Sequence, residues 1–265
     1  MSDVGHSFAY PFRHPAWVGR TLVGAALEVV PLVLLLPTVL SLVRHRHVFA
    51  WPAVLLMPVA AALGLAGRFI VFGYLGRAAR GVLEGSSTGL PAWDRMGDDL
   101  LEGLKLWLVA IALWLPAVAV TAGLALLVMA LTSPALAWLP VILVGPPAAL
   151  LTLAYVPAGL LAMVSEGTPG AAFSFDRVTV TVGRAFGPYA LAFLVALGAE
   201  IFAQLGLVLC CVGIFATRFI AHCVTVHAFA TAYGQGIQGA TSVSLPEGQP
   251  ATRTPDGLPP PTVST

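Results

Sequence analysis

The chain has 265 residues, of which 58% are hydrophobic and only 9% are charged, and its formal net charge is +1. A soluble domain carries about 25% charged residues, so this chain has too few charges to cover a surface in water. Lipid requires an apolar surface, whereas nucleic-acid binding requires an excess of basic residues. The composition therefore predicts an integral membrane protein whose partner is the lipid bilayer, and it argues against a nucleic-acid partner.

Six apolar runs reach the roughly 20 residues that a helix needs to cross the hydrocarbon core. In chain order they cover about 21–43, 48–75, 106–131, 135–163, 187–211 and 213–236. We therefore expect an all-α, polytopic membrane helix bundle of about six spans. Prolines fall within several of these runs, and membrane helices tolerate them when neighbouring groups satisfy the freed carbonyls.

The distribution of Lys and Arg among short loops predicts the orientation of the spans. If the N-terminus is cytoplasmic, nine basic residues fall on the cytoplasmic side and three on the other side. The nine are Arg13, Arg20, Arg77, Arg80, Arg95, Lys105, Arg177, Arg184 and Arg253, and the three are Arg44, Arg46 and Arg218. The bias predicts a multi-pass protein of the cell (cytoplasmic) membrane with both termini in the cytoplasm.

One long segment is both charged and amphipathic, and we name it the first elbow, residues 84–107. Pro91 suits the first turn of a helix, and apolar residues then recur at steps of three and four, which places them on one face. These residues are Trp93, Met96, Leu100, Leu104 and Trp107. Arg95 and Asp99 are spaced for an i, i+4 pair on the solvated side. The pattern predicts an amphipathic helix lying at the cytoplasmic interface.

A fainter copy of this segment, the second elbow, begins 82 residues later at Glu166. Trp93-Asp94-Arg95 recurs there as Phe175-Asp176-Arg177. The run 178–182 alternates like a strand but also fits a helix face, and we predict a helix because its counterpart is helical. The repetition predicts a diverged internal duplication of roughly 67–150 and 149–237 within a membrane domain of 1–239. The Pro-, Ser- and Thr-rich residues 240–265 predict a disordered cytoplasmic tail.

The elbow residues also carry a resemblance to a known family. The order Gly73-Tyr74-Leu75-Gly76-Arg77, Leu90-Pro91-Ala92-Trp93-Asp94 and Glu102-Gly103-Leu104 resembles the prokaryotic membrane family catalogued as domain of unknown function 4013. The segments 10–17 and 171–176 are similar to further parts of its pattern. The resemblance covers roughly residues 8–238. It implies a polytopic helical membrane protein, and it implies no established activity and no catalytic residues.

Ionisable side chains inside spans are energetically costly and are therefore candidates for function. Glu28 and Arg68 fall at similar depths in adjacent antiparallel spans, and so do Glu200 and His222, with Arg218 nearer the outer face. Each set has two interpretations: a solute or proton path, or a structural pair that fixes two helices. These five residues form the candidate intramembrane polar site.

No catalytic motif, metal-ligand set or cofactor-binding loop is found in the sequence. Cys223 and His227 share a helix face, but two ligands fall short of the three or four that a metal site needs. We therefore expect no enzyme activity, no metal and no cofactor. The sequence favours a non-catalytic membrane-organising or scaffold protein, which would act through its elbows and as a homo-oligomer or with other membrane proteins. The alternative is a small-solute transporter or channel-like protein that uses the buried charges, as duplication and proline-broken helices suggest.

Overall fold

The computed structural model describes residues 3–44, 51–86, 89–132, 136, 138–206 and 213–243. Over these residues the chain forms helices and short 3-10 turns and contains no strand. In order they are α1 (Asp3–Ala9), η1 (Tyr10–Phe12), α2 (Trp17–Arg44), α3 (Trp51–Leu83), α4 (Met96–Leu131), α5 (Trp138–Leu143), α6 (Gly145–Glu166), η3 (Pro169–Phe173), α7 (Phe175–Arg184), α8 (Phe186–Leu205) and α9 (Gly213–Val243). The predicted all-α class is confirmed.

Five helical segments of the described chain are long and apolar enough to cross a membrane. They are Met57–Leu83, Met96–Leu131, Trp138–Glu166, Phe186–Leu205 and Gly213–Gly239. The first of the six predicted spans coincides with the 28-residue helix α2, which is not one of these five. The length and apolar character of these five segments are compatible with a membrane protein.

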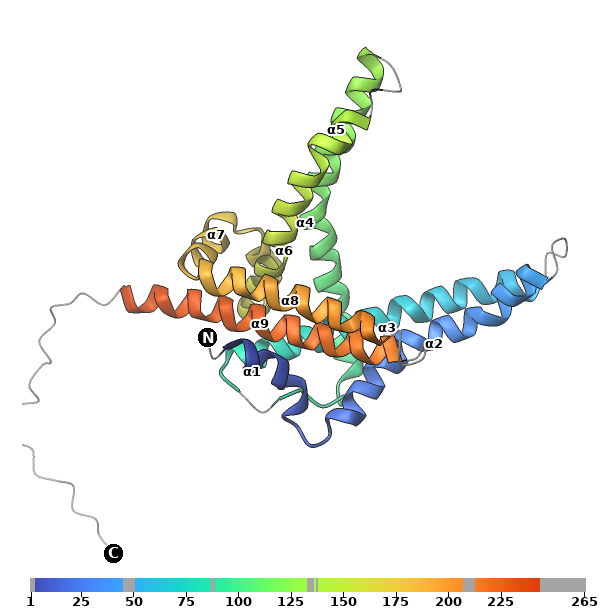
Figure 1. The fold of residues 1–265 in the computed structure, drawn as a ribbon, viewed down its shortest axis with the longest axis horizontal. Coiled ribbons are helices and arrows are strands. Elements are labelled where there is room, and N and C mark those ends of the chain that lie inside the picture. The colour runs from blue at the N-terminus through green and yellow to red at the C-terminus, as the bar shows by residue number, and fades with distance from the viewer. Residues whose placement is uncertain are drawn as a thin grey trace, which may run out of the picture.

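The long helices are arranged as three hairpin-like arms (Figure 1). Helices α2 and α3 lie side by side in one arm, and α8 and α9 lie side by side in a second. Helix α4 forms the third arm with α5 and α6, and this arm points away from the other two. Most large side chains of the third arm are exposed, including Leu115, Leu126 and Leu151, as expected of helices that face lipid.

The buried core lies where the arms meet. Its larger cluster joins the inner ends of α4 and α6 to α7, α8 and α9. A smaller cluster contains Tyr10, Tyr74, Leu90, Phe219 and Cys223, so it joins the N-terminal segment and the first elbow to α3 and α9. Helices α3 and α9 contribute to both clusters and therefore connect the two parts of the core.

Helices α3 and α4 cross in direct backbone contact. A Cβ atom added at Gly73 would overlap the backbone of Asp99, and one added at Gly103 would overlap the carbonyl oxygen of Phe69. Small residues at a helix crossing allow this approach in membranes. The crossing fixes the inner end of α4 against α3.

Two predicted elements differ from the observed ones. The run 135–163 corresponds to the single candidate span Trp138–Glu166, but this span is interrupted at Val144 between α5 and α6, where Gly145-Pro146-Pro147 starts a new helix. In the first elbow, the predicted helical turn at Pro91 is wrong, since α4 begins only at Met96 and then continues into the third predicted span without a break. The second elbow is helical over α7, as predicted.

Candidate functional site

Four of the five predicted intramembrane polar residues line one cavity, which has a volume of about 260 Å³. Glu28 comes from α2, Arg68 from α3, and Arg218 and His222 from α9. The rest of the lining is mainly apolar and comes from α3, α4, α6 and α9: Val71, Phe72, Leu75, Gly76, Ala79, Leu106, Pro157, Leu160, Leu161, Val164, Thr225, Val226 and Phe229. The fold therefore brings together polar residues that are as many as 194 positions apart in the sequence, from 28 to 222.

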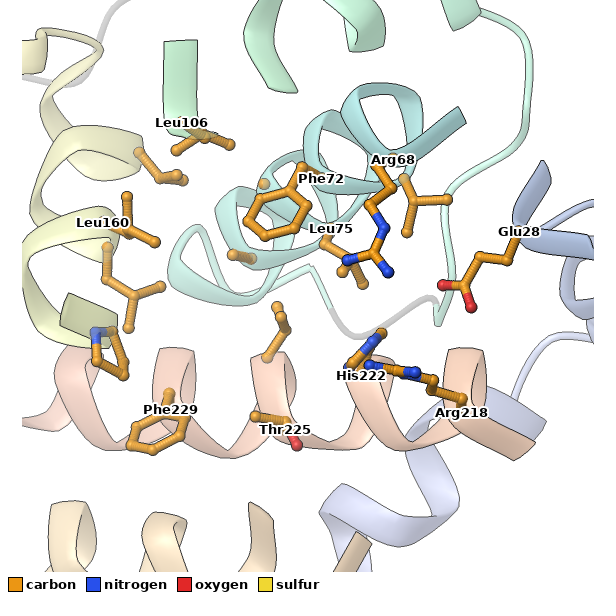
Figure 2. Close-up of a pocket in the computed structure, with 17 residues that line it drawn as sticks. Glu28, Arg68, Phe72, Leu75, Leu106, Leu160, Arg218, His222, Thr225 and Phe229 are labelled. Atoms are coloured by element: carbon orange, nitrogen blue, oxygen red, sulfur yellow. The ribbon is translucent and has the colours of Figure 1, made fainter. Parts of the chain in front are cut away.

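The charged groups face one another across one end of this cavity. Figure 2 shows the Glu28 carboxylate directed toward the guanidinium groups of both Arg68 and Arg218. Among the described residues no ion pair within 4.0 Å joins Glu28 to either arginine. The sequence predicted a pair of Glu28 and Arg68, whereas in the structure the Glu28 carboxylate faces the guanidinium groups of both Arg68 and Arg218.

Glu200 stands next to this group rather than in the cavity lining. It lies on α8, and its Oε1 is 3.8 Å from Nδ1 of His222. The two side chains are partly exposed. Depth matching therefore placed Glu200 beside His222 correctly, and His222 links it to the cavity.

The part of the first elbow before Met96 packs against the bundle and is not the interfacial helix that the sequence predicted. The Trp93 ring stacks on Tyr74 at 3.8 Å with an interplanar angle of 13°, and its indole N–H donates to the carbonyl of Arg20 over 2.9 Å. The Tyr74 hydroxyl donates to the carbonyl of Pro91 over 2.9 Å. These contacts hold Trp93 away from the apolar face of α4, whereas Trp107 lies on α4 with its ring 5.3 Å from that of Phe69.

Arg77 is the charged centre of the first elbow. It contacts Asp94 at 2.8 Å and Asp99 at 2.7 Å. The hydrogen bond from Arg77 holds the pKa of the Asp94 carboxyl below its usual value. Asp99 is only 3% exposed, so its predicted place on the solvated side next to Arg95 is wrong. Arg95 is itself exposed and immediately precedes α4.

The second elbow repeats part of this arrangement. The Tyr155 hydroxyl donates to the carbonyl of Ala172 over 2.9 Å, as Tyr74 does to Pro91, and both bonds span 17 residues. The Tyr155 ring lies 4.9 Å from that of Phe175, the counterpart of Trp93. Arg177 forms an ion pair with Glu166, while Asp176 is exposed in the first turn of α7.

The N-terminal segment packs on α9 in a way that sequence analysis missed. Tyr10 is 2% exposed, and its ring lies 4.4 Å from that of His227. Burial raises the pKa of the Tyr10 hydroxyl. Ser7 Oγ lies 3.1 Å from Nδ1 of His227. Only the position of Tyr10 in the family-like segment 10–17 could have signalled this contact.

No group of three or more His, Cys, Asp or Glu side chains that could hold a metal ion occurs in the described part of the chain. Cys223 is fully buried. The other two cysteines, and residues 244–265 of the tail predicted over 240–265, lie outside the described residues, whereas residues 240–243 belong to α9.

The described chain is thus an all-α protein with helices long and apolar enough to cross a membrane and a cavity lined in part by charged residues. The chain belongs to the family described as protein of unknown function (DUF4013), whose model matches residues 54–212, more than half of the chain. The match includes both elbows, Arg68 and Glu200, while Glu28, Arg218 and His222 lie outside it. No curated protein and no solved structure matches the chain.

Proposed function

We propose that this protein binds a small solute in the cavity between α3, α6 and α9 and moves it within or across the cell membrane, without catalysing a reaction. The observation that carries the proposal is the convergence of Glu28, Arg68, Arg218 and His222 on one cavity. Charges inside spans are costly and usually mark a path or a binding site. A structural pair joins one positive and one negative group, whereas here two arginines and one carboxylate line a cavity.

The proposal also includes an internal duplication and a bundle of six membrane spans. The repeated bond from Tyr74 to Pro91 and from Tyr155 to Ala172 supports two related halves. Helix α2 would be the sixth span, because it pairs with α3 along one arm. Both elbows would then lie on the cytoplasmic side, so the halves would be parallel repeats.

A membrane-organising role is the second candidate, and exposed aromatic residues of the second elbow favour it. Phe175, the first residue of α7, is 55% exposed, and Phe186, the first residue of α8, is 70% exposed. Such residues can insert at the level of lipid headgroups. The first elbow gives this role less support than its sequence did, because Trp93 is stacked on Tyr74. A homo-oligomer or a protein partner would belong to this second role.

Native mass spectrometry of the detergent-purified protein would separate the two candidates. We expect a small molecule that copurifies with the wild type and is lost from both Arg68→Gln and Glu28→Gln. The matched controls Arg184→Gln and Asp176→Asn, which change exposed charges outside the cavity, should retain it. Retention of phospholipids alone, with their loss on replacing Phe175 and Phe186 but not on changing the cavity, would contradict solute binding.

A further inference from the structure

The cavity has two chemically different ends. Figure 2 shows Glu28, Arg68, Arg218 and His222 gathered at one end, with Leu106, Leu160 and Phe229 at the other. From this division we propose that the solute is an amphiphilic anion, with a carboxylate or phosphate head at the arginines and a short alkyl chain along the apolar wall. The inference rests on the proposed solute-binding function and specifies its ligand class.

The charge of the lining favours an anion over a cation. Two guanidinium groups face a single carboxylate, that of Glu28, within the lining that the structure describes. The nearby Glu200 carboxylate lies against His222, on α8, rather than within the lining. An uncompensated positive charge in an apolar region is unfavourable, and a bound anion would neutralise it.

The type of basic residue favours a carboxylate or phosphate head. Arginine presents a planar fork of N–H donors that matches these groups in a bidentate manner. Within the described residues, neither the side chain of Arg68 nor that of Arg218 donates a hydrogen bond or forms an ion pair within 4.0 Å. Their donors therefore remain available at the cavity end where Figure 2 shows them converging.

The other end favours an alkyl chain. Leu106 from α4, Leu160 from α6 and Phe229 from α9 form the wall there (Figure 2). Burial of each methylene group against such a wall raises affinity about fourfold. A fully hydrophilic anion such as inorganic phosphate would make no contact with this apolar wall. An alkyl chain attached to the anion would contact it and therefore increase the affinity.

The cavity volume limits the size of the chain. At about 260 Å³ the cavity is near the lower end of ligand pockets, which measure about 300–1,000 Å³. A single short chain fits this volume better than the two long chains of a phospholipid. We therefore take an eight-carbon chain as the probe.

The test is a titration followed by native mass spectrometry of the full chain in a non-ionic detergent. The probes are octanoate, octyl phosphate, octyltrimethylammonium and inorganic phosphate. We expect octanoate or octyl phosphate to bind at least tenfold more tightly than the cationic octyl probe and inorganic phosphate. We also expect Arg68→Gln and Arg218→Gln each to weaken that binding at least tenfold, with Arg68→Lys intermediate and the control Arg184→Gln unchanged.

A variant at the apolar end tests the chain separately. Leu160→Trp should weaken binding of octyl phosphate and leave that of inorganic phosphate unchanged, and an unchanged thermal unfolding midpoint would show that each variant is folded. Binding of inorganic phosphate as strong as that of octyl phosphate, but dependent on Arg68, would overturn the amphiphile and leave solute binding intact. Equal binding of the cationic probe would overturn the anionic head. Both proposals fail if no cavity variant changes the binding of any probe and no small molecule copurifies with the wild type.

Discussion

Arg77 joins the extended part of the first elbow to the start of α4. It reaches Asp94 on one side and the buried Asp99 on the other, while its side chain is only 24% exposed. Removal of Arg77 would leave the Asp99 carboxylate buried without its cation. A buried charged group that loses its hydrogen-bond partner is strongly destabilising.

We therefore predict that Arg77→Gln lowers the free energy of unfolding by about 2 kcal/mol. Arg95→Gln is the matched control, because Arg95 is exposed and its side chain forms no ion pair within the described part of the chain. The measurement is unfolding in mixed micelles at increasing dodecyl sulfate. Equal losses for the two variants would show that the contacts with Asp94 and Asp99 contribute little.

At the scale of elements, the crossing of α3 and α4 depends on two glycines. We predict that Gly103→Ala destabilises the protein by about 3 kcal/mol, since the added methyl group would overlap the carbonyl of Phe69 and overpacking has this order of cost. Gly97→Ala on the same helix meets no atom within 4 Å and should be neutral or slightly stabilising. The same unfolding assay compares them, and a tolerated Gly103→Ala would mean that the helices do not touch at this point.

Helix class and the approximate positions of the long helices follow from the sequence, because long apolar runs in lipid have few other ways to satisfy their backbone groups. The start of α4 at Met96, in contrast, could not be predicted from the sequence. The local preference of Pro91 is outweighed by contacts of Tyr74 and Trp93, which join segments distant in the chain. A residue pattern within one segment carries no information about such partners.

The candidate site, too, could be predicted from the sequence only in part. Depth along antiparallel spans was enough to place Glu200 near His222 and Glu28 on the same cavity as Arg68. It did not indicate that Arg218 also faces Glu28, because depth does not define the rotation of a helix about its axis. Rotation is set by packing, here that of Phe219 and Cys223 in the smaller core cluster.

At the scale of the whole molecule, the distribution of basic residues predicts that both elbows are cytoplasmic. In a background without the native cysteines, Ser86→Cys and Thr179→Cys should react with a membrane-impermeant maleimide only in inverted vesicles. Thr132→Cys, at the far end of α4, should react only in intact cells. Ser86, Thr132 and Thr179 are all exposed. Labelling of Ser86→Cys and Thr132→Cys from the same side would contradict α4 as a span.

The glycine crossing gives the third arm the geometry of a lever. Its pivot is the contact of Gly103 with α3, and Leu106, which belongs to the cavity wall, lies three residues beyond it on α4. Membrane helices adjust to bilayer thickness by tilting. If α4 spans the bilayer as proposed, a tilt of the α4–α6 arm about this contact would displace Leu106 and change the width of the apolar end, so we expect the thickness of the surrounding bilayer to affect which solutes the cavity binds.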